Sequence, residues 1–114
     1  MLLVDMENKS IFLKVFGDYP LNKVMDFLIT YEDFDYPMKE IAVKSGVGYS
    51  TLKLFWKHLV KFGIVKHTRD IGNAKLFKLN VENQIVKKFS KFYLDLAKVE
   101  TEKYLGNNVA RVRT

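Results

Sequence analysis

The sequence predicts an α+β domain, mainly α, that ends in a long C-terminal helix. Three observations predict this class. Apolar residues recur at helical spacing in three stretches before residue 63. Two short runs rich in β-branched and aromatic residues, 64–69 and 75–79, follow these stretches on either side of a turn that contains glycine and asparagine. From about residue 81, apolar residues again recur every three or four positions past Ala97.

Composition excludes several classes of protein. The chain has 114 residues, of which 48% are hydrophobic, which is enough for one domain with a packed core. It has no cysteine, so we expect no disulfide and no cysteine-ligated metal. His58 and His67 lie nine residues apart, which is not a chelating pair, and we expect no metal and no cofactor. The apolar runs are too short to span a bilayer and the first residues do not form a signal peptide, so we expect a cytoplasmic protein.

The first third of the chain predicts one strand and one helix. Residues 11–16 form an apolar run typical of a short strand, which Gly17 and Asp18 end. Asp18 is the predicted cap of the next helix, and Pro20 falls in its first turn. The predicted inward stripe of this helix follows the spacing i, i+3, i+4, i+7: Leu21, Val24, Met25 and Leu28. The acidic stretch 31–36 breaks the pattern and predicts a solvated loop or a short strand.

The middle third predicts two helices joined by a glycine turn. The first runs from Pro37 to about Ser45 and buries Ile41 and Ala42, and the second runs from about Tyr49 to Phe62. Gly46 and Gly48 break the chain between them, Val47 fills the turn, and Gly63 ends the second helix. The second helix has a predicted inward stripe of Leu52, Trp56 and Leu59. This helix-turn-helix, followed directly by the hairpin of 64–79, has the element order of a winged helix.

The charge is concentrated in the same segment. Residues 1–37 carry three lysines against seven acids, whereas residues 38–79 carry nine basic residues against two acids. Residues 80–114 carry seven basic residues against four acids, and the whole chain has a net charge of +6. A basic middle third beside an acidic first third indicates one face suited to a polyanion, and helix-turn-helix units bind double-stranded DNA.

The outward arc of the second helix supplies the predicted DNA-binding residues. These are Tyr49, Ser50, Thr51, Lys53, Leu54, Lys57 and Lys61. Ser50, Thr51 and Lys53 are the predicted base readers, while Tyr49, Lys57 and Lys61 are predicted to contact phosphates. Leu54 either touches a thymine methyl group or packs elsewhere. The predicted wing contacts are Arg69, Asn73 and Lys75.

Each of these assignments has a structural alternative. The lysines recur every four residues, so they also fit an ordinary solvated helix face. Arg69 and Lys75 are also placed to pair with Asp70, and we expect His58 at the surface. The residues form no recognisable nucleophile–base set or carboxylate pair, so we expect no enzyme.

The final helix carries an apolar seam with the spacing of a heptad. We predict a dimer interface on it, formed by Ile85, Phe89, Phe92, Tyr93, Leu96 and Val99. Val86 widens the seam enough for it to pack on its own domain, on a second copy, or on both. The chain therefore divides into a DNA-binding domain at 1–80, a dimerisation helix at 81–105 and a flexible basic tail at 106–114.

Six segments along residues 11–96 resemble a known family. They are KVFGDYPL (14–21), DFLI (26–29), DFDY (33–36), TLKLFWKHL (51–59), GIVK (63–66) and TRDIGNAKLFKLNVENQI (68–85). The sequence resembles the short archaeal winged helix-turn-helix transcriptional regulators of a MarR/ArsR-like branch. It departs from their pattern at Gln84, where a proline is common, and at Asp70 and Asn73, where further basic or polar residues often stand. The resemblance implies a winged-helix fold and DNA as the partner, and it carries over no pathway.

The sequence thus predicts a homodimeric, sequence-specific DNA-binding protein that acts as a transcriptional repressor. Two alternatives remain open. One is a partition or replication protein of a plasmid or virus, and the other is a winged helix that binds an acidic protein partner. Nothing in the sequence indicates a small-molecule effector.

Overall fold

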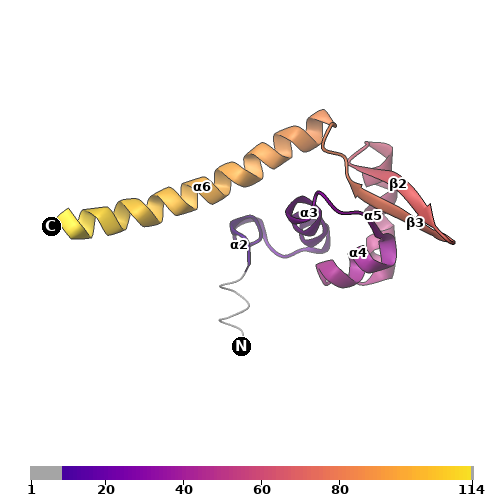
Figure 1. The fold of residues 1–114 in the computed structure, drawn as a ribbon. Helices are drawn as coiled ribbons and strands as arrows, with labels where there is room; N and C mark the ends of the chain where they lie inside the picture. Colours follow the sequence, from indigo (N-terminus) through magenta and orange to yellow (C-terminus); the bar gives the residue numbers. More distant parts are fainter. Residues whose placement is uncertain (1–8, 114) are drawn as a thin grey trace.

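A computed structural model describes residues 9–113, with side chains for residues 9–103. Five helices and three strands make up this part of the chain (Figure 1). In chain order they are α2 (Ile11–Phe16), α3 (Pro20–Thr30), β1 (Tyr36–Pro37), α4 (Met38–Ser45), α5 (Tyr49–Lys61), β2 (Val65–Ile71), β3 (Ala74–Leu79) and α6 (Gln84–Arg113). The predicted α+β class, mainly α, with a long C-terminal helix is confirmed.

The core lies between α3, α4, α5 and the sheet. Ile41, Leu52 and Leu79 are fully buried in it, and each comes from a different element. Trp56 is buried on the inner face of α5 and meets Phe77 of β3 edge-on, with 5.3 Å between ring centroids. These contacts fix the base of the hairpin against the helix that precedes it.

The helix-turn-helix has the predicted bounds to within one residue. Gly46 adopts the left-handed conformation with φ of 74°, and the amide of Val47 donates to the carbonyl of Ala42 at 2.9 Å. Val47 is buried beneath the turn, as its apolar character predicts. Gly63, just beyond α5, also has a positive φ, of 69°.

The sheet is antiparallel, with β3 in the centre between β1 and β2. Tyr36 of β1 pairs with Phe77 of β3. Of the two predictions for the acidic stretch 31–36, a loop or a short strand, its end therefore forms a short strand. The turn between β2 and β3 is Gly72 and Asn73, and only Gly72 has a positive φ.

The predicted strand at 11–16 is wrong, because these residues form helix α2. The side chain of Ser10 accepts a hydrogen bond from the amide of Leu13, which caps the first turn. On the inner face of α2, Phe12 is buried against Phe89 and Tyr93 of α6, at centroid distances of 5.4 and 5.8 Å. Tertiary burial of an aromatic face therefore overrides the β-propensity of this run.

Two details of α3 also differ from the prediction. Asp18 does not cap the helix; its carboxylate pairs with Lys9 at 2.7 Å instead, and Tyr19 stands at the N-cap without a side-chain bond. Pro20 begins the helix as predicted. Of the predicted stripe, Leu21 is exposed, and the buried face includes Phe27 and Ile29 in addition to Val24 and Leu28.

Helix α6 leaves the domain and projects past α2 and α3 (Figure 1). It runs as one helix to Arg113, past the end that the sequence predicts near Leu105, and Thr114 lies outside the described residues. The projecting helix gives the molecule extents of 62 × 34 × 22 Å. Among the residues whose side chains are described, α6 contacts its own domain through the buried Val86 and through Phe89, Phe92 and Tyr93.

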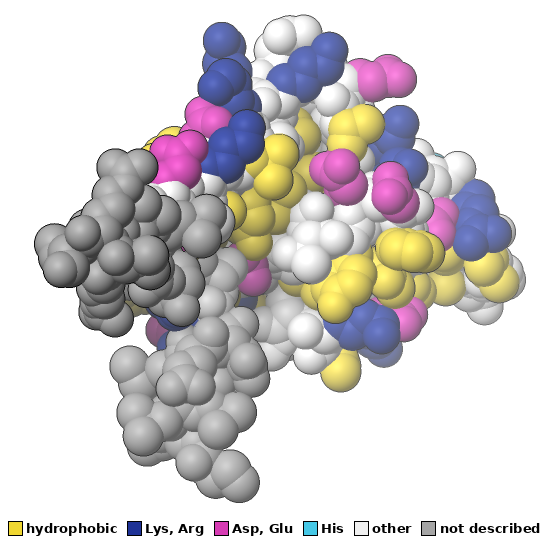
Figure 2. All heavy atoms as spheres, turned by 60° about the vertical axis from the view of Figure 1, so that its left-hand side comes forward, with side chains coloured by type: hydrophobic (Ala, Val, Ile, Leu, Met, Phe, Trp, Pro, Cys, Tyr) yellow, Lys and Arg dark blue, Asp and Glu magenta, His cyan; other side chains and the backbone are white. Residues whose placement is uncertain are grey.

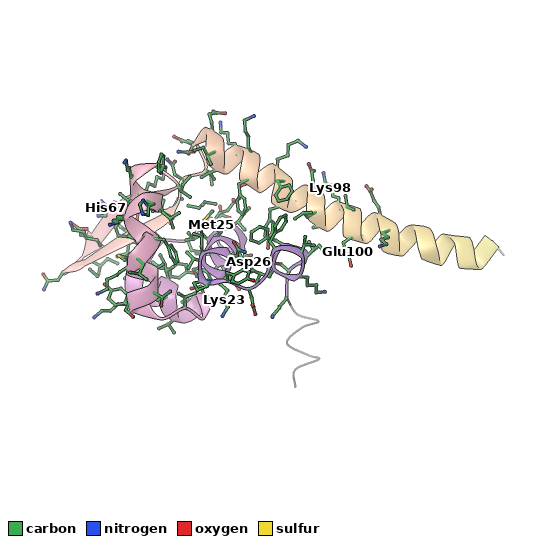
Figure 3. All side chains as sticks on the ribbon, turned by 180° about the vertical axis from the view of Figure 1, so that it is seen from behind. Lys23, Met25, Asp26, His67, Lys98 and Glu100 are labelled. Atoms are coloured by element: carbon green, nitrogen blue, oxygen red, sulfur yellow. The ribbon has the colours of Figure 1, made fainter. Side chains whose placement is uncertain are left out.

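A polar cluster joins α2, α3 and α6 beside these aromatic contacts. Asp26 of α3 accepts hydrogen bonds from the hydroxyl groups of Ser10 and Tyr93, at 2.6 and 2.7 Å. Burial raises the pKa of the Tyr93 phenol, which keeps it protonated as a donor. Figure 3 shows Asp26 on α3 next to α2, on the side that faces α6.

Candidate nucleic-acid interface

The outer face of α5 carries the residues that the sequence predicts as DNA contacts. Leu52, Trp56 and Leu59 are buried, which turns the opposite arc of the helix toward solvent. All of the predicted residues on this helix are exposed except Thr51, which is half-buried. Leu54 is 73% exposed, so packing within the described part of the chain does not account for it. His58 is also at the surface, as expected.

Two lysines flank the first residue of α5. The ammonium group of Lys53 lies 4.7 Å from the centre of the Tyr49 ring, and that of Lys39 lies 5.7 Å from it. These distances are within the range of cation–π interactions. Lys39 belongs to α4 and was not among the predicted site residues. Its position next to Tyr49 depends on how α4 and α5 cross, and the only sequence signal is a positive charge in the first turn of α4.

A groove of about 470 Å³ separates the start of α5 from the hairpin. Lys39 and Tyr49 line it from the helices, while Asn73 and Lys75 line it from the hairpin. Its remaining lining is mainly apolar: Pro37, Met38, Ala74 and Phe77. The structure therefore brings together Tyr49 and Lys53 with two of the three predicted wing residues, Asn73 and Lys75.

Arg69, the third predicted wing residue, lies apart from this groove and is bound to an acid. Its Nε and one terminal nitrogen donate to the two carboxylate oxygens of Asp35, at 3.0 and 3.1 Å. The guanidinium of Arg69 and the hydroxyl of Thr68 lower the pKa of the Asp35 carboxyl to about 2. The predicted alternative, a pair between Arg69 and Asp70, is wrong, because the Asp70 carboxylate meets the His67 ring at 2.6 Å instead.

In the described chain, most basic side chains around α5 and the groove have no acidic partner. Within residues 9–103, five lysines around α5 and the groove form no ion pair: Lys39, Lys53, Lys57, Lys61 and Lys75. The acid nearest to them in sequence, Glu40, pairs with Lys44 at 3.7 Å. The described chain holds no cluster of three potential metal ligands. The interface is thus a cationic surface with an apolar groove.

The order α4, turn, α5, then a hairpin packed on α5 through Trp56 and Phe77 decides the fold. The chain has a winged-helix fold. A ZitR double mutant from Lactococcus lactis in its apo form matches the chain with a TM-score of 0.56 and 16% identity, over 84% of this chain and 74% of that one. MepR, a transcription regulator of the Staphylococcus aureus multidrug efflux pump MepA, matches with a TM-score of 0.54 and 12% identity, over 78% and 72% of the two chains.

NadR, solved in complex with 4-hydroxyphenylacetate, is similar to this winged helix to the same degree. The TM-score is 0.54 and the identity 16%; the match covers 79% of this chain and 64% of NadR, so the winged helix spans less than two thirds of that protein. No family model matches the sequence, and no curated protein does. At these identities the likeness establishes the fold that the resemblance implied, and membership of the archaeal regulator branch stays a prediction.

The residues predicted for a dimer fall into two groups on α6. Phe89 and Tyr93 are half-buried against α2 of the same chain, and Phe92 also meets Phe16, with 5.6 Å between ring centroids. Leu96 is half-buried, whereas Ile85 and Val99 are 55% and 61% exposed. Figure 2, which brings this end of the molecule forward, shows hydrophobic side chains at the surface among charged ones. None of the helices in the described chain has the length and apolar character that a membrane span requires.

Proposed function

We propose that this chain is a sequence-specific, double-stranded DNA-binding transcription regulator that acts as a homodimeric repressor. The observation that carries the proposal is the groove between α5 and the hairpin, together with the lysines around it that have no acidic partner in the described chain. A polyanion supplies the missing negative charge, and the apolar lining suits the deoxyribose rings between phosphates. The winged-helix fold supports the same partner.

In the proposed complex, α5 lies in the major groove with its N-terminal turns toward the base edges. Ser50, Thr51 and Lys53 read bases, because hydroxyl groups both donate and accept and a lysine reaches guanine O6 and N7. Tyr49, Lys57 and Lys61 contact phosphates and set the register. Lys39 and Lys75, on opposite walls of the groove, hold the backbone of one strand.

The proposed dimer is formed by the projecting half of α6. Leu94 and Val99 are 57% and 61% exposed on a helix that has left its own domain, and burying such side chains stabilises an association. Lys98 and Glu100 also lie on this projecting part (Figure 3). A twofold dimer presents two copies of α5 to half-sites about 34 Å apart, so the proposed operator is a pseudo-palindrome.

The first experiment measures duplex binding as a function of salt. We expect the affinity to fall steeply as salt rises, with a slope set by the number of phosphates neutralised. Lys57→Glu should lower both the affinity and the slope. Lys14→Glu is the matched control, because it changes the net charge by the same amount at an exposed position of α2, and it should have little effect. A flat salt response, or equal losses from both variants, argues against a DNA-binding face on α5.

A footprint titration tests the regulatory role. A repressor that acts by occlusion should protect one short palindrome, with no extension as concentration rises. Protection that spreads along the duplex assigns the chain to partition or replication instead. If the affinity for duplex DNA is no greater than the charge of the protein alone provides, the chain is instead an interaction module for acidic proteins.

A further inference from the structure

Strand β2 contains an irregularity at the level of Asp35. His67 pairs with Phe77 and Arg69 pairs with Leu76, so Thr68 is an extra residue in β2. In a regular strand, two neighbours such as Thr68 and Arg69 point to opposite faces of the sheet. A β-bulge re-aims the side chains around it. Here the side chains of both neighbours reach the same carboxylate, that of Asp35.

The contacts at Asp35 form a compact network. The guanidinium of Arg69 binds both carboxylate oxygens, at 3.0 and 3.1 Å, which is the bidentate geometry that fixes orientation as well as distance. The hydroxyl of Thr68 is within hydrogen-bond distance of Asp35 Oδ2 and of the carbonyl oxygen of Leu76, at 3.3 Å from the latter. The Asp35 side chain is 16% exposed, whereas that of Arg69 is 61% exposed.

This network joins the two outer strands of the sheet. Asp35 directly precedes β1, whereas Thr68 and Arg69 belong to β2, and β3 lies between these two strands. Asn73 and Lys75, which line the groove beside α5, lie beyond the bulge toward the hairpin turn. The part of the hairpin beyond the bulge carries one wall of that groove. The angle between this part and the rest of the sheet therefore sets the width of the groove.

We propose that Asp35 is a positioning residue for DNA binding. Through Thr68 and Arg69 it holds the wing, which is the hairpin of β2 and β3, at one angle to α5. The inference rests on the proposed function and deepens it. Arg69 then acts through its planar fork and its bond to Asp35, and the wing contacts to DNA come from Asn73 and Lys75. The carboxylate strengthens DNA binding even though its own charge repels phosphates.

The opposite reading assigns Arg69 to a phosphate and makes Asp35 a competitor for it. The two readings predict opposite signs for Asp35→Asn, which keeps the size of the side chain and removes its charge. Under our proposal this variant weakens duplex binding about threefold to fivefold, which is the upper range for a well-formed ion pair near the protein surface. If Asp35 only masks Arg69, the variant binds more tightly than wild type.

Asp33→Asn is the matched control, since Asp33 is exposed two residues earlier and makes no ion pair in the described chain. It removes the same charge from the same segment and should tighten binding by less than about twofold. A loss of affinity in Asp35→Asn alone supports the proposal. Equal affinities in the two variants, or tighter binding by Asp35→Asn, overturn it.

Arg69→Lys separates orientation from charge. It keeps the positive charge but loses the bidentate fork. We expect it to weaken binding as much as Asp35→Asn does, and the double variant to be no weaker than either single one. Full affinity in Arg69→Lys, or additive losses in the double variant, contradicts a role through orientation.

A measurement without DNA keeps this inference separate from the proposed function. Amide hydrogen exchange in 66–76 should be faster in Asp35→Asn than in Asp33→Asn, with exchange in α3 and α5 unchanged. The emission of Trp56, the sole tryptophan, reports that the fold is intact. Thr68→Val, which changes no charge, serves as a second variant if Asp35→Asn lowers the melting temperature. If the wild type fails to bind duplexes, the proposed function is wrong and exchange alone decides whether the network fixes the wing.

Discussion

Substitution of Lys53 tests which side chains on α5 recognise DNA bases. Lys53 lies one turn into the helix with its ammonium group over Tyr49, on the part of α5 next to the groove. We expect Lys53→Ala to cost about 1–3 kcal/mol of binding free energy on a selected duplex and to relax the base preference at one position. Competition binding with single-base variants of a duplex selected from a random library measures both effects.

Lys61→Ala is the comparison for Lys53→Ala, because Lys61 ends α5 on the same face. It should lower the affinity for all duplexes by a similar factor, as a phosphate contact does. A uniform loss in Lys53→Ala would place Lys53 in the same class, and the bases would then be read by Ser50 and Thr51.

Asp35 makes the stability of the domain depend on acidity. Arg69 and Thr68 lower the pKa of its carboxyl from 3.8 to about 2 in the folded protein. The stabilising contribution is therefore fully present above pH 3.8 and is lost as the pH falls through about 2. Urea denaturation followed by Trp56 emission at about pH 5, 3 and 2 should show a smaller decline in the unfolding free energy for Asp35→Asn than for wild type. Equal declines would mean that the ion pair does not form in solution.

Single residues were predictable where the signal was local. The inward positions of Trp56 and Leu52 and the outward position of Leu54 follow from helical spacing alone. The partner of Arg69 lies 34 positions away and depends on the fold and on a bulge, so the sequence predicted a DNA contact for Arg69, with the adjacent Asp70 as the alternative partner. Lys39 escaped prediction for the same reason, since its position next to Tyr49 depends on the crossing of two helices.

The turn between α4 and α5 tests a backbone requirement. Gly46 has φ of 74°, and no atom lies within 4 Å of the place that a Cβ would take, so a substitution there meets backbone strain and no clash. Gly46→Ala should lower the unfolding free energy by about 1–2 kcal/mol. Gly48→Ala is the control, because Gly48 has φ of −63°, which alanine adopts without strain; the unfolding free energy of this variant should fall less, by only what alanine costs at the N-cap of α5. Equal losses in thermal or urea denaturation would contradict this account.

Elements with their own start and stop signals were predicted closely. Pro20 begins α3, whereas Gly46 and Gly63 follow the last turns of α4 and α5. Each of the three residues acts through its own backbone geometry. Residues 11–16 lack such a strong signal, because β-branched and aromatic residues suit a strand as well as a buried helix. Ser10 three residues before Leu13, and Phe12 four residues before Phe16, were the available indications of a helix. The extent of α6 beyond Leu105 was missed because Gly106, Asn107 and Asn108 have low helix propensity and interrupt the helical pattern of the sequence.

The proposed dimer is a property of the whole molecule. Val99 is 61% exposed on the half of α6 that projects from the domain, so Val99→Glu should place a charge in the interface and shift the protein toward monomers in sedimentation equilibrium. Val43→Glu is the control, because Val43 is 79% exposed on α4 and the change is chemically identical. A wild-type monomer, or a dimer that Val99→Glu leaves intact, contradicts an interface on α6.

The sequence predicts that α6 has an apolar face, but it does not predict which element or which second chain buries that face. The heptad spacing of Phe89, Phe92 and Leu96 fits packing within the chain and packing between chains equally well. The structure assigns Phe89 and Tyr93 to their own domain, because α2 is a helix that brings Phe12 against them. The remaining apolar positions beyond Tyr93 project past the domain, and for them the dimer stays a proposal.

The outer edges of the sheet protect the protein against aggregation by strand addition. An exposed strand edge is a template for pairing with another chain, and short edges, prolines, charges and bulges suppress such pairing. One edge, β1, is two residues long and contains Pro37, which has no amide hydrogen to donate. The other, β2, is charged along its length and is interrupted at Thr68 by the bulge. Straightening that bulge by deleting Thr68 would therefore leave a longer regular edge and make the protein more prone to form β-aggregates.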